Sequence, residues 1–264
     1  MVEKNVGPGG RERRWFLYRD DTILLRRAED GTFTVPLATE PPAVLRGPLH
    51  ELGAYHGVAC VAARAQSLPE GAPWAAVTIR DSYTLTETPL PSLIGRGFQL
   101  LHWDSHSRFC PHCGSACQPD SPISKRCPDC GELLFPHIAV AVLALVTRDD
   151  AALLVHANNF KGPYYSCIAG YVEPGETLEE CAAREVLEET GIDVEDIRYF
   201  GSQPWPFPSL LMAAFTARYK AGELVLQESE LDAGAFFDRR ALPELPPPFT
   251  LSRRLIDAWI QQAG

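Results

Sequence analysis

Three glutamates are spaced so that a helix would bring them to one face. Glu185, Glu188 and Glu189 stand at positions i, i+3 and i+4, within about one helical turn. Unpaired carboxylates this close repel one another, at a cost of roughly a few tenths of a kcal/mol per pair. Carboxylate oxygens favour hard divalent ions such as Mg²⁺ or Mn²⁺, which also bind phosphate. The spacing therefore favours a metal site, and a solvated charge run paired with Arg184 is the alternative.

The helix that would carry these glutamates has start and stop signals of its own. Thr177 is followed three residues later by Glu180, a capping-box pattern that predicts a helix start at Leu178. Gly191 predicts a left-handed C-cap at the other end. A separate apolar face, suited to packing on a sheet, is formed by Leu178, Ala182 and Val186.

Two Cys-x-x-Cys-Gly knuckles precede this helix. Four thiolates at such spacing predict a closed tetrahedral Zn²⁺ site. The ligands would be Cys110, Cys113, Cys127 and Cys130. A site with all four positions filled has no room for water or substrate, so the zinc is predicted to be structural. Two disulfides are the alternative, which the absence of a recognisable secretory signal disfavours.

Around these motifs the chain has the pattern of an α+β protein. Short apolar clusters broken by Gly and Pro turns, over 15–94, predict a β-rich domain with a few helical pieces. The apolar run 138–146 predicts a buried strand, with 152–156 as its partner across the polar turn 147–150. An amphipathic helix is expected over Leu251–Gln261.

Composition narrows the classes of function. The formal net charge of −10 argues against a protein that holds long nucleic acid by phosphate neutralisation alone, although an acidic protein can bind small polyanions through metal ions. No apolar run approaches the roughly 20 residues that cross a bilayer, so no membrane segment is expected. The cytoplasm is the expected location.

The glutamates lie in a segment that resembles the Nudix box, G-x5-E-x7-R-E-U-x-E-E-x-G-U, where U is aliphatic. The nine matching positions are Gly170, Glu176, Arg184, Glu185, Val186, Glu188, Glu189, Gly191 and Ile192. The resemblance implies a metal-dependent hydrolase of pyrophosphate bonds. It assigns Glu185, Glu189 and the carbonyl of Ala169 as ligands of Mg²⁺ or Mn²⁺, with Glu188 as the base or the group that positions water. Arg184 would hold the preceding loop against the helix through Glu176.

A stiff stretch in which prolines alternate with aromatic residues follows the box, over Ser202–Met212. It cannot be a helix and is suited to forming a wall on which a planar ring stacks, although a core or dimer-interface role is the alternative. It resembles the SQPWPFPxS array of bacterial NADH pyrophosphatases. That family also has an N-terminal domain and a four-cysteine zinc ribbon before the Nudix box, and this chain has all three features in that order.

The second resemblance implies a substrate and a set of contacts. Bacterial NADH pyrophosphatases cleave NAD(H) to nicotinamide mononucleotide and AMP, and they remove the NAD cap from RNA. They are homodimers with sites built from both subunits. It implies Glu230 as a further metal ligand. The implied substrate contacts are Phe135, Tyr171, Gln203, Pro204, Trp205, Pro206, Phe207, Pro208, Ser209, Leu210, Met212 and Ser252. The alternatives are hydrolysis of another nucleoside diphosphate derivative, such as ADP-ribose or a dinucleoside polyphosphate, and a catalytically silent zinc-ribbon nucleotide sensor.

One residue departs from the array. The last serine of the pattern falls on Leu210, which cannot hydrogen-bond a ligand. The adjacent Ser209 is expected to point to the opposite face if the chain is extended. The loss of one such contact would cost on the order of 1 kcal/mol of binding.

These observations predict an α+β chain in three parts. Residues 1–95 would form an N-terminal β-rich domain and residues 96–136 the zinc ribbon. Residues 137–264 would form a Nudix domain, an α/β/α sandwich with a mixed sheet.

Overall fold

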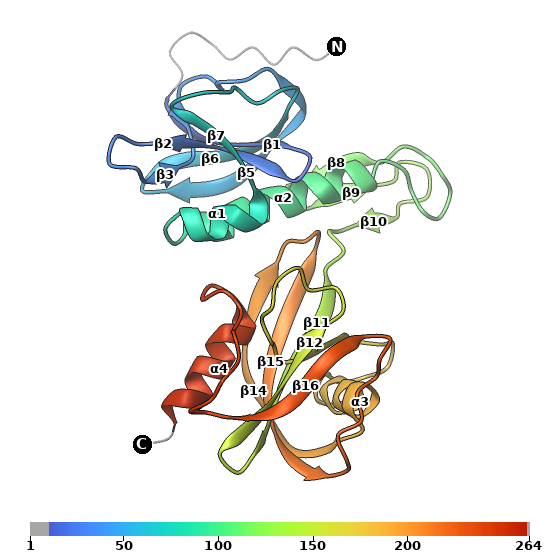
Figure 1. Ribbon diagram of the computed structural model, residues 1–264. Helices are drawn as coiled ribbons and strands as arrows, with labels where there is room; N and C mark the ends of the chain where they lie inside the picture. Colours follow the sequence, from blue (N-terminus) through green and yellow to red (C-terminus); the bar gives the residue numbers. More distant parts are fainter. Residues whose placement is uncertain (1–10, 263–264) are drawn as a thin grey trace. The chain divides into compact units, whose positions relative to one another are not determined.

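The computed structural model describes residues 11–262, which divide into two compact units (Figure 1). The first unit runs to His137 and also includes the short segment Pro206–Ser209. The second unit comprises Ile138–Trp205 and the chain from Leu210 onward. Within the described residues, no helix is both long enough and apolar enough to span a membrane.

The first unit is built on a seven-stranded sheet in the order β3-β2-β1-β6-β5, with β4 paired to β1 and β7 paired to β2. Its strands are β1 (Arg13–Arg19), β2 (Thr22–Arg27), β3 (Phe33–Thr34), β4 (Leu37–Ala38), β5 (Leu45–Tyr55), β6 (Val58–Ala65) and β7 (Trp74–Thr78). Residues of β1 alternate between the two faces: Phe16 and Tyr18 enter one apolar cluster, and Trp15 and Leu17 enter another. This domain is β-rich, as predicted.

Two helices, α1 (Ile79–Leu85) and α2 (Leu90–His106), follow the last strand of this sheet. The main apolar cluster includes Leu100 and Leu101 of α2, so this helix is part of the domain core. The buried Tyr18 hydroxyl donates to the carbonyl of Ile94 at 2.7 Å. A Cβ at Gly97 would lie 2.6 Å from the same hydroxyl, which explains a glycine at this close helix–sheet contact. The predicted boundary between residues 95 and 96 thus falls inside α2.

The cysteine-bearing segment of the first unit contains a small antiparallel sheet in the order β10-β9-β8. Its strands are β8 (Gln118–Ser121), β9 (Ser124–Arg126) and β10 (Leu133–Leu134). The Nζ of Lys125 in β9 lies 2.8 Å from the carboxylate of Asp104 in α2 and 2.7 Å from its carbonyl oxygen. This side chain therefore links the ribbon to the helix that precedes it.

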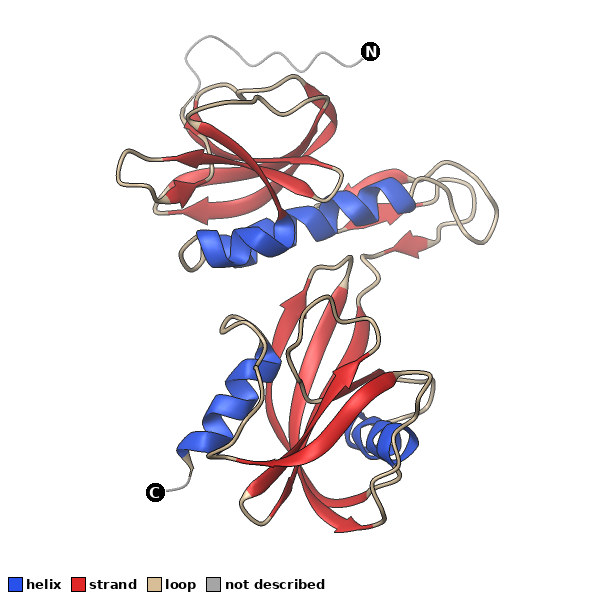
Figure 2. Ribbon diagram, viewed as in Figure 1, coloured by secondary structure: helices blue, strands red, loops and turns tan. Residues whose placement is uncertain are grey.

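The second unit is a six-stranded mixed sheet between two helices, so the α+β fold class is confirmed (Figure 2). Its strands are β11 (Ala139–Arg148), β12 (Ala151–Ala157), β13 (Ile168–Tyr171), β14 (Asp193–Trp205), β15 (Leu210–Ala221) and β16 (Leu231–Asp238). The order is β14-β15-β11-β12-β16, with β13 paired to β11 and with β11 parallel to β15. The predicted pairing of β11 with β12 is confirmed by the register Val146↔Leu153.

The two helices of this unit, α3 (Leu178–Thr190) and α4 (Leu251–Gln261), pack in different apolar clusters on opposite sides of the sheet (Figure 2). Ala182 and Val186 of α3 are fully buried in one cluster, as the apolar face of the sequence predicts. Leu255 and Trp259 bury the apolar face of α4 in the other. Both predicted helices are confirmed, and the sheet between them fixes where the glutamates of α3 lie.

Candidate functional site

Helix α3 begins and ends through the contacts that its sequence predicts. The Thr177 side chain accepts a hydrogen bond from the amide of Glu180, and the Glu180 carboxylate accepts one from the amide of Thr177. Gly191 caps the other end with a left-handed φ of 68°, and its amide donates to the carbonyl of Leu187. The capping box and C-cap set the helix frame on which the glutamates stand.

The three predicted glutamates of α3 differ in their exposure. Glu189 is only 5% exposed, whereas the side chain of Glu185 is 13% exposed and that of Glu188 is 57% exposed. A Cβ added at Gly170 in β13 would overlap the Glu185 carboxyl group. The glycine at the start of the box therefore allows a buried carboxylate to lie directly against the strand.

Arg184 forms ion pairs with several of these acids. Its guanidinium pairs with Glu176, with Glu185 at 2.8 Å and with Glu188 at 3.2 Å. It also donates to the carbonyl of Tyr171 at 2.9 Å. The predicted support is thus present: one arginine ties the loop before the helix to the helix itself, and it fixes the orientation of Glu185.

Glu189 has no such cationic partner among residues 11–262. Burial, together with the negative charges of Glu185, Glu230 and Glu188, raises its pKa to about 8. Burial also raises the pKa of Glu185, against the opposing effect of Arg184. A buried carboxylate beside three others is a donor set that fits a hard divalent cation.

Backbone contacts bring Glu230 to this end of α3, although it lies 41 residues beyond Glu189 in the sequence. The amide of Gln227 donates to the carbonyl of Glu189, and the amide of Glu230 donates back to the carbonyl of Gln227, both at 2.9 Å. Ala169, whose carbonyl is the remaining predicted ligand, lies exposed in β13 next to Gly170. The second unit therefore assembles the predicted carboxylate group from α3 and the segment before β16.

The four cysteines of the ribbon form a separate cluster. Their sulfur atoms all lie within 4.8 Å of one another, with separations of 3.4 Å for Cys113–Cys127 and 3.6 Å for Cys110–Cys130. A tetrahedral site with Zn–S bonds of about 2.3 Å would place the sulfur atoms about 3.8 Å apart, so this donor set fits zinc. The cysteines are free thiols, and the disulfide alternative has no support here.

The two knuckles have the same backbone geometry. Gly114 and Gly131 both have a φ of +80°, and their amides donate to the carbonyls of Cys110 and Cys127. This left-handed conformation is available to glycine without strain. It turns both cysteines of each knuckle toward one point.

Part of the proline-aromatic array lies in the second unit, at the end of β14. The indole of Trp205 lies parallel to the ring of Phe249, with 6.3 Å between centroids and 17° between planes. The Gln203 side-chain amide donates to the carbonyl of Phe249 at 2.9 Å. Met212 pairs with Gln203 across the strands, so these three predicted residues lie together. Phe249 was missed by the sequence analysis, because only its place after three prolines marks it.

The remainder of the array belongs to the first unit. The Phe207 ring lies 6.1 Å from that of Tyr83 and 4.9 Å from the Arg80 guanidinium. The Ser209 hydroxyl donates to the carbonyl of His137 at 2.8 Å. Ser209 therefore already has a backbone partner, and Leu210 begins β15 opposite Trp205. The segment is extended and turned rather than helical, as predicted.

Three further predicted contacts are distributed over both units. Phe135 of the first unit and Tyr171 of the second are exposed, by 57% and 59%. Ser252, in contrast, is buried in the first turn of α4, 2.6 Å from the Ser166 hydroxyl. It also accepts a hydrogen bond from the amide of Cys167 at 3.4 Å. Ser252 therefore supports the chain before β13, and its contact with a ligand stays a prediction.

Two protein-family models match this chain. A model described as the NUDIX domain matches residues 136–260. The chain contains a NUDIX domain. A second model, described as an NADH pyrophosphatase-like rudimentary NUDIX domain, matches residues 12–103. The two matches together cover the seven-stranded sheet of the first unit and the six-stranded sheet of the second, and residues 136–260 include the carboxylate group of α3.

Curated relatives are similar to this chain over about three fifths of its length. The chain is 41% identical over 169 residues to the NAD-capped RNA hydrolase NudC of Pseudomonas aeruginosa (strain LESB58), covering 64% of this chain and 61% of the relative. It is 44% identical over 163 residues to the protein of the same name from Chromobacterium violaceum, covering 61% of each. It is 42% identical over 166 residues to that of Escherichia coli O1:K1 / APEC, covering 62% of this chain and 65% of the relative. The chain thus spans less than two thirds of the length of these relatives.

A solved structure shares the fold of part of this chain. The crystal structure of a NUDIX hydrolase from Nitrosomonas europaea matches with a TM-score of 0.50 and 23% identity, covering 59% of this chain and 92% of that one. This likeness concerns the fold.

The buried glutamate gives a pH-dependent prediction for protein without added Mg²⁺ or Mn²⁺. The unfolded chain releases the Glu189 proton near pH 4.5, whereas the folded chain keeps it up to about pH 8. The folded state therefore binds more protons over this range, and its free energy of unfolding falls as pH rises. Thermal unfolding of Glu189→Gln should lack this part of the decline. Glu179→Gln, on the exposed first turn of α3, is the matched control. Identical pH profiles for the wild type and Glu189→Gln would contradict the assignment.

Proposed function

We propose that this protein hydrolyses the pyrophosphate bond of NAD(H), releasing nicotinamide mononucleotide and AMP, and removes the NAD cap from RNA 5′ ends. The observation that carries the proposal is the buried Glu189 beside Glu185, Glu188 and Glu230, in a NUDIX domain. The NADH pyrophosphatase-like match over residues 12–103 and relatives named NAD-capped RNA hydrolase favour an NAD-type end of the substrate.

The carboxylates would hold the catalytic ions. Glu185 and Glu189, together with Glu230 and the carbonyl of Ala169, are the proposed ligands, and Mg²⁺ or Mn²⁺ suits their oxygen atoms. When bound, such ions neutralise charge on the pyrophosphate and lower the pKa of water. Arg184 positions Glu185 through the 2.8 Å ion pair, because it is itself anchored to Tyr171 and Glu176.

Glu188 is the proposed proton acceptor. Its carboxylate is mostly exposed and lies one turn from the buried ligands, so it can reach solvent. In the reaction, the oxygen of water bonds to one phosphorus, and the bridging P–O bond breaks. One proton of the water passes to Glu188, and the other stays on the phosphate that receives the oxygen. The two products leave as monophosphates.

Aromatic side chains would hold the bases of the substrate. Trp205, with Phe249 parallel to it, offers a flat apolar surface at the end of β14. The exposed rings of Tyr171 and Phe135 are further stacking surfaces, and a homodimer in which two chains contribute to each site is part of the proposal. Hydrolysis of ADP-ribose or of dinucleoside polyphosphates is the second candidate, since the carboxylate group requires only a pyrophosphate.

A product analysis tests the proposal directly. NADH, NAD⁺, ADP-ribose, a dinucleoside polyphosphate and NAD-capped RNA are incubated separately with Mg²⁺ or Mn²⁺, and the products are resolved by chromatography. We expect nicotinamide mononucleotide from the NAD-type substrates and its loss in Glu189→Gln, with Glu179→Gln as the control. No nicotinamide mononucleotide from any substrate would contradict the NAD assignment. Wild-type turnover by Glu189→Gln on every substrate would contradict the metal site.

Substitution of Leu210 by serine is predicted to increase the affinity for NADH. Leu210→Ser restores a hydroxyl at the start of β15, and Ser209 cannot supply one while it donates to His137. One added hydrogen bond of about 1 kcal/mol corresponds to roughly a fivefold lower KM for NADH, with kcat little changed. The control is Leu211→Ser, the next residue on the strand, which points to the other face. An unchanged or higher KM for Leu210→Ser would show that this position makes no polar contact.

The cysteine ribbon is predicted to unfold when its metal is removed. We propose that the four cysteines hold a structural Zn²⁺, because they leave no open position for water. Removal of zinc should unfold residues 110–130, which limited proteolysis detects as new cleavage there. Cys127→Ser should do the same and bind less zinc. A zinc-free ribbon that resists protease as the loaded protein does would contradict a structural role.

A further inference from the structure

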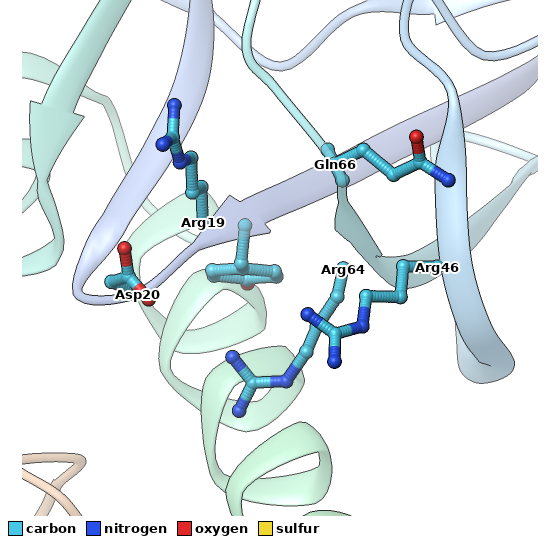
Figure 3. A pocket seen from close by; sticks show the side chains of 7 residues that line it. Arg19, Asp20, Arg46, Arg64 and Gln66 are labelled. Carbon is cyan, nitrogen blue, oxygen red and sulfur yellow. The ribbon is translucent and has the colours of Figure 1, made fainter.

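The first unit contains a basic cavity lined by arginines that form no ion pair with the described residues, 11–262. Two adjoining hollows, of about 580 and 720 Å³, share Arg46 of β5 and Arg64 of β6. Figure 3 shows the guanidinium groups of these two arginines side by side in the smaller hollow. Arg108 and Phe109, just before the first cysteine knuckle, line the larger one.

Arg46 and Arg64 stand directly opposite each other in the antiparallel pairing of β5 with β6. Like charges in this position destabilise a sheet. Neither guanidinium forms an ion pair with an acid among residues 11–262, and the polar contact of Arg64 is a long one, 3.5 Å to the carbonyl of Leu101. The chain has 34 acidic against 24 basic residues, so acids are not scarce. The repulsion between the two guanidinium groups is therefore available for an anionic ligand to neutralise.

The acidic residues that line the cavity do not neutralise Arg46 and Arg64. Asp104 lies in the larger hollow, but its carboxylate is 2.8 Å from the Nζ of Lys125 and 3.9 Å from His50. Asp20 lines the smaller hollow beside Arg19, at the turn between β1 and β2. The cavity thus keeps a positive excess from Arg46, Arg64 and Arg108.

The aromatic ring of Phe109 lines the larger hollow. Phe109 is 59% exposed, and the Arg108 guanidinium lies 5.8 Å from its ring centre. An exposed phenyl ring next to unpaired guanidinium groups is suited to stack a base while the arginines bind phosphate. We propose that this cavity is a nucleotide-binding site, in which Arg46 and Arg64 hold phosphate groups and Phe109 stacks a base. The ligand is a single-stranded RNA segment or a free nucleotide, which share this chemistry.

Binding without catalysis tests the proposal. Fluorescence anisotropy is measured with a labelled 12-nucleotide single-stranded RNA bearing a 5′-hydroxyl, and with a fluorescent ATP analogue, in the absence of Mg²⁺ and Mn²⁺. The variant is Arg46→Gln with Arg64→Gln. The matched control is Arg26→Gln, an exposed arginine of β2 that does not line either hollow.

We expect the double variant to weaken binding at least tenfold and Arg26→Gln to change it less than twofold. For RNA, the slope of log affinity against log salt should fall by about 1.4, since each phosphate contact on a single strand contributes about 0.7. Phe109→Leu should weaken both probes about tenfold while leaving competition by inorganic tripolyphosphate unchanged. Tighter binding of RNA than of the ATP analogue identifies a strand as the ligand, and equal binding identifies a free nucleotide.

Thermal unfolding separates this role from a structural one. Removal of two opposed charges should leave the melting temperature unchanged or raise it, whereas a structural pair would lower it. If the double variant melts lower, the exposed single variant Arg46→Gln provides the binding comparison. The proposal is overturned if neither probe binds the wild type, or if Arg46→Gln and the double variant bind both probes as the wild type does. Because no hydrolysis is measured, that result would leave the proposed pyrophosphatase activity untouched.

Discussion

The burial of Glu189 among other carboxylates is the constraint on which the second unit depends. Its pKa of about 8 in the absence of metal expresses an unfavourable free energy that the protein alone does not relieve. A fold keeps such a group when a ligand compensates for it, and a divalent cation does so most directly. Three features of the unit have a common effect: the capping box at Thr177, the close approach of Gly170 to Glu185, and the anchored Arg184. They hold the acids close together despite their repulsion.

The local parts of this arrangement could be predicted from the sequence. The bounds of α3 follow from Thr177, Glu180 and Gly191, because capping contacts involve residues close in the chain. The β11–β12 pair follows from two apolar runs and a short polar turn. The cysteine knuckles follow from their spacing, since each glycine after a knuckle adopts the left-handed conformation that the turn requires. In each case the determining interactions span only a few residues.

The parts that depend on tertiary packing could not be predicted. Phe249 lies 44 residues beyond Trp205, and nothing in its neighbourhood marks it as a stacking partner. Ser252 is buried against Ser166, a pairing that depends on how α4 packs on the sheet. Helix α2 crosses the expected boundary at residue 95 because its apolar residues belong to the core of the first unit. The opposition of Arg46 and Arg64 depends on the register of β5 with β6, which their sequences do not specify.

Direct measurement of Mn²⁺ binding tests the central claim, that the carboxylates of α3 are held together for a divalent cation. The protein is first saturated with zinc at the cysteine ribbon, and free Mn²⁺ is then followed by electron paramagnetic resonance during titration. We expect the wild type and Glu179→Gln to bind Mn²⁺, and Glu189→Gln to bind at least one ion fewer. The same number of Mn²⁺ ions bound at the same affinity by Glu189→Gln and the wild type would contradict it.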